Sequence, residues 1–185
     1  MSLSRVAALT GRPWFWAAVV GVLFAGPLAR GLTQGRPPPP PGVLGAFPAF
    51  TLQADDGSQL GTSDLHGRAF IADLLCADCA QAGARVEAMR TLQHRTRNLG
   101  DAVRLLSFSS GLDAAALVEL RRSHGAGQRW VLLAGAPAAA PSLFPGANTV
   151  VLVDGRLRIR GRYEAGDAAE IDRLLQDLAL VAALP

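Results

Sequence analysis

Residues 68–83 read RAFIADLLCADCAQAG and hold both cysteines of the chain, Cys76 and Cys79. The run 68–75 has the length and the flanking residues of a buried central strand. From Asp78 or Cys79 onward, apolar side chains recur every three or four residues, which predicts a helix. The apolar stripe of this helix consists of Ala82, Val86, Met89 and Leu92 or Gln93. Four charged residues are predicted to lie outside the stripe: Arg85, Glu87, Arg90 and Arg95.

The chain after residue 46 continues to alternate between strand and helix patterns. Further strands are expected at 103–108 and 129–133, and hairpins at 50–60 and 149–163 around the turn signals DDG and DG. A tight helical turn is expected at 62–67. Two more helices are predicted, capped by Asp113 and Asp167. The apolar face of the last helix consists of Ile171, Leu174, Leu175 and Leu178. This order predicts an α/β domain with a thioredoxin-like mixed sheet flanked by helices.

An uncharged apolar run at 13–29 lies between Arg12 and Arg30. Its length is at the lower limit for crossing a bilayer, and Trp14 and Trp16 at one end suit the membrane interface. We expect an N-terminal transmembrane signal anchor. A cleaved signal peptide is the alternative, because its apolar region can have the same composition.

Five consecutive prolines at 37–41 favour an extended polyproline spacer, and a disordered leader without a partner is the simpler interpretation. The expected organisation is therefore a signal anchor at 1–31, a proline-rich linker at 32–45 and a thioredoxin-like domain at 46–185.

The charge balance excludes one class of partner. The 18 basic and 15 acidic residues leave a net charge of +3, which is small and dispersed, and no nucleic-acid motif accompanies it. We therefore expect no nucleic-acid binding. Alternating arginines are predicted to share one face of the second hairpin, where they are either solvated or dock to an acidic partner or to anionic headgroups. These residues are Arg156, Arg158, Arg160 and Arg162.

Cys76 and Cys79 are expected where a buried strand ends and a helix begins. Amide N–H groups and the helix dipole stabilise a thiolate at such a position. A CxxC pair beside a βαβ pattern is a moderately specific redox signature. Asp73, three residues before Cys76, could act as a proton acceptor if it is buried. The alternative for Asp73 is a carboxylate satisfied by a backbone group or an arginine.

A four-ligand zinc site is hard to build, because the two cysteines need two further ligands. His66, His94 and His124 are the three histidines of the chain. Each is expected to be a solvated surface imidazole.

Four segments in order carry a resemblance to a known family: FTLQADDGSQLGTSDLHGRAFIADLLC at 50–76, VRLLSFS at 103–109, RWVLLAGAP at 129–137 and VVLVDGRLRIRGRYEA at 150–165. Over roughly 47–180 the chain resembles the Sco/SenC proteins, which are membrane-anchored, thioredoxin-fold copper chaperones of cytochrome c oxidase assembly. The resemblance implies a single-pass anchor in the inner membrane, with the domain on the periplasmic side. It also implies a partner that is an oxidase subunit or another copper or thiol assembly factor.

The resemblance implies bound copper, held by two cysteines separated by three residues, with flanking prolines, and by a histidine shortly before the LVD strand. Here the separation is two residues, the prolines are missing, and 145–149 contains no histidine. Counted from Asp73 without gaps, Cys79 matches the first family cysteine and Gly83 the second. A small loop deletion would instead let Cys76 and Cys79 stand for the pair.

Three functions stay open at this point. One is a Sco-like copper chaperone with Cys79 and Cys76 as ligands. The second is a membrane-tethered thiol-disulfide oxidoreductase, which would make the chain an enzyme with Cys76 and Cys79 as its redox pair. The third is a non-catalytic assembly factor whose copper site has decayed.

Overall fold

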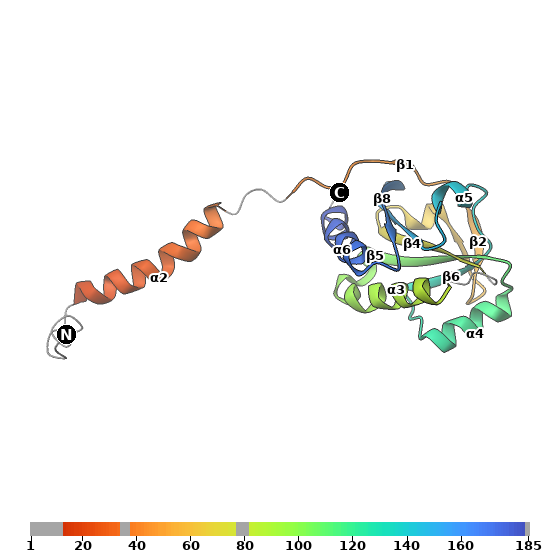
Figure 1. Cartoon of the computed structure of the whole chain (residues 1–185), viewed down its shortest axis with the longest axis horizontal. Helices are drawn as coiled ribbons and strands as arrows, with labels where there is room; N and C mark the ends of the chain where they lie inside the picture. Colours follow the sequence, from red (N-terminus) through yellow and green to blue (C-terminus); the bar gives the residue numbers. More distant parts are fainter. Residues whose placement is uncertain (1–12, 34–37, 77–81, 184–185) are drawn as a thin grey trace. The chain divides into compact units, whose positions relative to one another are not determined.

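The computed structural model of the chain describes residues 13–33, 38–76 and 82–183. The chain divides into two compact units, one ending at Pro38 and the other beginning at Pro39 (Figure 1). The first unit contains helix α2 (Pro13–Thr33), which has Pro27 inside it. No helix of the described part combines the length and the apolar character needed to cross a bilayer. The transmembrane anchor expected at 1–31 is therefore not confirmed.

The second unit is built on one mixed sheet of eight strands in the order β1-β8-β7-β4-β5-β6-β2-β3. Central strand β4 pairs in parallel with β5 and antiparallel with β7, and β6 extends the parallel part. The strands are β1 (Gly45–Ala46), β2 (Thr51–Ala54), β3 (Gln59–Gly61), β4 (Ala69–Cys76), β5 (Val103–Ser110), β6 (Trp130–Ala134), β7 (Thr149–Val153) and β8 (Arg158–Glu164). The predicted central strand, both hairpins and the mixed sheet are confirmed.

Helices cover both faces of this sheet. They are η1 (Thr62–Leu65), α3 (Ala82–Arg95), η2 (Arg97–Ala102), α4 (Ala114–His124), α5 (Ala140–Leu143) and α6 (Ala168–Ala182). Buried side chains of α3, α4 and α6 join one core with Ile71 and Leu75 of β4. On the other face, Phe70 of β4 and Phe108 of β5 form a second core with three further phenylalanines and residues of α5. Asp113 and Asp167 cap α4 and α6 as predicted, each accepting a hydrogen bond from a backbone N–H of the first turn.

The buried stripe of α3 differs from the prediction at one position. Val86, Met89 and Leu92 are buried as expected, whereas Glu87 and Arg90 are exposed. Arg85 was predicted to lie outside the stripe, and this is wrong, because its side chain is only 3 % exposed. A charged side chain is buried this completely only where the surroundings compensate the charge.

The second hairpin was predicted to carry four arginines on one strand face, and this is wrong for Arg156. Strand β8 begins at Arg158, so Arg156 lies in the turn before it. The side chains of Arg158 and Arg160 both donate to Oδ2 of the buried Asp154, which leaves neither as a freely solvated cation. Arg162 donates to a backbone carbonyl of α5. The turn carboxylate therefore holds Arg158 and Arg160 in the fold, whereas α5 holds Arg162.

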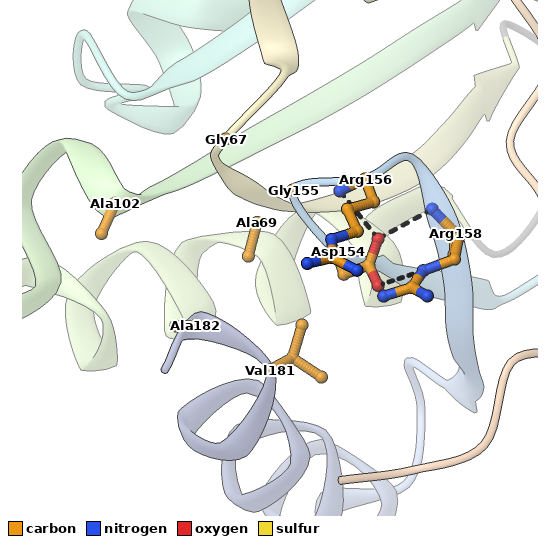
Figure 2. Close-up of a pocket in the computed structure, with 9 residues that line it drawn as sticks. All are labelled: Gly67, Ala69, Ala102, Asp154, Gly155, Arg156, Arg158, Val181 and Ala182. Carbon is orange, nitrogen blue, oxygen red and sulfur yellow. Dashed lines mark hydrogen bonds and ion pairs between the residues drawn. The ribbon is translucent and has the colours of Figure 1, made fainter. Parts of the chain in front are cut away.

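A cavity of about 310 Å³ lies beside this turn (Figure 2). It is lined by Asp154, Arg156 and Arg158 on one side and by small side chains on the other. One of those is Ala69, the first residue of β4, so the cavity lies at the opposite end of that strand from Cys76.

Candidate thiol site at the end of strand β4

Cys76 is the last residue of β4 and is paired with Ser110 of β5. Its backbone is therefore at the carboxyl end of a central strand, as predicted. Cys79 falls within 77–81 and lies outside the described residues. Helix α3 begins at Ala82 and packs on β4, so the chain passes from strand to helix across the cysteine pair. The N–H groups of a helix amino terminus stabilise a nearby thiolate.

Asp73 is fully buried on the α3 side of β4. It shares this face with Ile71 and Leu75, because side chains two apart on a strand point the same way. Burial raises the pKa of Asp73 from the usual value near 4 to about 7, and the hydrogen bond from Ser107 and the charge of Arg85 only partly oppose this rise. The carboxyl group can therefore gain and lose a proton near neutral pH.

The two carboxyl oxygens of Asp73 have different surroundings. Oδ1 accepts a hydrogen bond of 2.5 Å from the hydroxyl of Ser107, which in turn accepts one of 2.8 Å from Nε1 of Trp130. Oδ2 is buried and accepts no hydrogen bond from any described residue. A buried polar atom without a partner is rare in native proteins and often marks a functional role. Oδ2 is thus the atom of this site that can take up a proton.

Ser107, Trp130 and Arg85 were not identified as site residues from the sequence. A signal for Ser107 does exist, because it interrupts the apolar run of its strand and its polar group needs a buried partner. Arg85 has a weaker signal, since it precedes Met89 and Leu92 by four and seven residues and so continues their stripe. Nothing in the sequence indicates that Trp130 bonds Ser107.

The three histidines lie at the far end of the sheet from Cys76. His66 follows η1 and precedes β4. His94 is in the last turn of α3 and His124 ends α4, and helices that connect parallel strands end near the amino ends of those strands. This end is about 23 Å from the carboxyl end of β4, counted along its eight residues. Among the described residues, no three His, Cys, Asp or Glu side chains gather as a metal site.

The segment to which the family resemblance assigns a histidine does approach the thiol end. Val150 of β7 is paired with Asp73, so the first residues of β7 lie near the carboxyl end of β4. The residue just before this strand is Asn148, which is half-buried. A carboxamide oxygen is a hard donor that suits Cu(I) poorly, whereas thiolates suit it well. The described residues therefore fit a thiol pair better than a site of two thiolates and one imidazole.

Comparisons with known proteins identify the fold that carries this site. No family model matches the sequence, and neither does any curated protein. Among solved structures, BsSco, a member of the Sco family of cytochrome c oxidase assembly proteins with a disulfide switch, matches with a TM-score of 0.68 and 19 % identity. The match covers 80 % of this chain and 100 % of BsSco. This chain has the thioredoxin-like fold of the Sco proteins.

Two further structures support the same thioredoxin-like fold. A Sco1/SenC family lipoprotein from Bacillus anthracis matches with a TM-score of 0.65 and 18 % identity, over 75 % of this chain and 95 % of the lipoprotein. The thioredoxin domain of a thiol-disulfide oxidoreductase from Bacteroides vulgatus matches with a TM-score of 0.57 and 12 % identity. This match covers 73 % of this chain and 96 % of the oxidoreductase domain. At these identities the matches show the fold alone. They agree with the resemblance found in the sequence.

Proposed function

We propose that this chain is a Sco-like thiol redox protein in which Cys76 and Cys79 cycle between a dithiol and a disulfide. The observation that carries the proposal is the buried carboxyl group of Asp73, three residues before Cys76, whose Oδ2 has no hydrogen-bond partner in the described part of the chain. A carboxyl group whose pKa is near neutrality is matched to accepting and returning a thiol proton.

In the first step, the S–H bond of Cys79 breaks, its proton moves to Oδ2 of Asp73, and a thiolate remains. Cys79 is favoured for this role because α3, which begins three residues later, packs on the face of β4 that holds Asp73. The amino terminus of α3 stabilises the negative charge on sulfur.

In the second step, the thiolate attacks a sulfur of a partner's disulfide, whose S–S bond breaks and releases a partner thiolate. Cys76 then gives its proton to the released partner thiolate, and its own thiolate attacks the Cys79 sulfur of the mixed disulfide, whose S–S bond breaks. The second partner thiolate released in this way takes the proton held by Asp73. The pair ends as a disulfide and the partner as a dithiol, after transfer of two electrons to the partner.

A redox titration of the purified full chain in glutathione buffers tests this proposal. We expect a reversible two-electron transition of the cysteine pair. The change in mass after thiol alkylation measures this transition. The variant Cys76→Ser should accumulate the mixed disulfide with a disulfide substrate, because the attacking thiol remains, whereas Cys79→Ser should not. A pair that stays reduced throughout the titration contradicts the proposal.

Copper carriage is the second candidate, and the likeness to Sco structures supports it. In this alternative Cu(I) is the cargo, and two thiolates hold it with a ligand from outside the chain in place of the imidazole. The reduced full chain should then take up one Cu(I) against a competing chelator and lose it on Cys79→Ser. Uptake equal to that of the double variant Cys76→Ser/Cys79→Ser would exclude copper carriage.

We place either activity in the assembly of cytochrome c oxidase, on the periplasmic side of the inner membrane, with the N-terminal segment as the export signal or anchor. Cell fractionation and protease accessibility of spheroplasts test this location. Complementation of an oxidase-assembly defect by the double cysteine variant, at the level of the wild type, would favour a non-catalytic assembly factor.

A further inference from the structure

Arg85 is a buried charge in the first turn of α3. Its side chain is 3 % exposed, although Glu87 and Arg90 on the same helix are exposed. It lies four and seven residues before Met89 and Leu92, both fully buried, and therefore on the side of α3 that packs against the sheet. Burial of an arginine this close to the thiol site requires a compensating negative group.

Asp73 is a described carboxyl group on which the charge of Arg85 acts. Strand β4 presents Asp73 on the face against which α3 packs. The positive charge of Arg85 favours the ionised carboxylate and lowers its pKa, whereas burial raises it. Arg85 is the only charged side chain of the described residues that acts on Asp73 in this way.

The other neighbours of Asp73 that the described strands and α6 contribute are neutral. Strand β5 contributes the hydroxyl of Ser107, and β6 contributes the indole N–H of Trp130 behind it. Strand β7 places Val150 opposite Asp73, and the side chains that α6 contributes to this core are apolar. A hydroxyl donor alone leaves a fully buried carboxyl group largely protonated, because desolvation is the larger effect.

We propose that Arg85 is a positioning residue that raises the ionised fraction of Asp73 near neutral pH, so that the carboxylate can take the thiol proton. The proposal rests on the redox function proposed above. Without the guanidinium, Asp73 is a neutral acid near pH 7 and can no longer accept a proton from a cysteine. The thiol then becomes reactive only at higher pH.

Titration of the Asp73 carboxyl carbon by NMR tests the proposal without reference to the thiols. The full chain is compared with Arg85→Gln, Arg85→Lys and the control Arg90→Gln, which removes an exposed arginine of the same helix. The spectrum of Asp73→Asn identifies the signal. We expect Arg85→Gln to raise the pKa of Asp73 by about one unit or more, which is at least a tenfold change in proton affinity. Arg85→Lys should return the pKa of Asp73 most of the way to the wild-type value. Arg90→Gln should leave that pKa unchanged.

The pH profile of thiol alkylation is the second measurement. Its midpoint should move to higher pH in Arg85→Gln and return in Arg85→Lys. If the titration of Asp73 is the same in Arg85→Gln and the wild type, the proposal is overturned. If the titration shifts but the alkylation profile does not, Arg85 controls Asp73 while the role of Asp73 in thiol chemistry fails.

Arg85→Met provides the same comparison should Arg85→Gln not fold. It retains an unbranched apolar side chain for packing and removes the charge. An unchanged Asp73 titration in Arg85→Met overturns the proposal equally.

Discussion

The hydroxyl of Ser107 donates a hydrogen bond of 2.5 Å to Oδ1 of Asp73, although the two residues are 34 positions apart in the chain. Both are fully buried on neighbouring parallel strands, and each faces the other in the strand register. This bond favours the ionised carboxylate, whereas burial favours the neutral acid. The proton affinity of Asp73 is therefore set by groups that meet only in the folded protein.

Ser107→Ala should raise the pKa of Asp73. A hydrogen bond to a charged group contributes about 1.5–3 kcal/mol, which corresponds to about one to two pKa units. Titration of the Asp73 carboxyl carbon measures the shift. Ser109→Ala is the matched control, because the hydroxyl of Ser109 lies on the same strand but donates to the carbonyl of Leu133. Equal pKa values in the two variants would contradict the prediction.

Asp73→Asn should remove a pH dependence of stability. The pKa of Asp73 is about 7 in the folded chain and about 3.9 in the unfolded chain, so the folded state binds more protons between these values. This contribution to stability is complete below about pH 4 and is lost as the pH rises to about 7. The fall is at most about 1.4 kcal/mol per pH unit.

Urea unfolding of the wild type and Asp73→Asn at several pH values between 4 and 8 measures this difference. The unfolding free energy of the wild type should fall relative to that of the variant as the pH rises. Asp101→Asn serves as the control, since Asp101 is exposed. A constant difference between wild type and Asp73→Asn over this range would show that the carboxyl group does not titrate there.

Replacing all three histidines should leave Cu(I) binding unchanged, if the chain binds Cu(I). His66, His94 and His124 lie at the opposite end of the sheet from Cys76, so none can reach a metal held there. The measurement is Cu(I) stoichiometry against a chelator for His66→Gln/His94→Gln/His124→Gln and for Cys76→Ser. Loss of copper from the histidine variant would show that the metal binds elsewhere.

Asp154→Ala should destabilise the fold without changing thiol reactivity. Asp154 binds Arg158 and the almost fully buried Arg160, and its Oδ1 also accepts the backbone N–H groups of the turn. Removing one partner of a buried ion pair costs about 3–5 kcal/mol. The exposed side chain of Arg156, in the same turn, makes Arg156→Ala the control, with an expected change below about 0.5 kcal/mol.

Thermal or urea unfolding measures both variants, and alkylation rates report on the thiols. Asp154 follows β7 at the end of the sheet opposite Cys76. Asp154→Ala should therefore lower the free energy of unfolding without changing the alkylation rate. A change in alkylation rate as large as in Asp73→Asn would indicate that the turn and the thiol site are coupled.

Local patterns determined the secondary structure. The central strand, the two hairpins and the capped helices were predicted correctly because alternation, turn residues and caps act within a few residues of one another. The position of Cys76 at the end of the central strand followed from the same patterns. The burial of Arg85 was missed despite its spacing to Met89 and Leu92, because a charged residue is counted as exposed unless its compensating partner is known.

The sequence by itself determined that a cysteine pair follows a buried strand and that residues 145–149, directly before the LVD strand, contain no histidine. Only the tertiary structure decided that Asp73 meets Ser107 and the field of Arg85, and that all three histidines lie far from Cys76. The physical reason is that periodicity and capping depend on neighbours in the chain, whereas proton affinity and ligand sets depend on side chains that strand register and helix packing bring together.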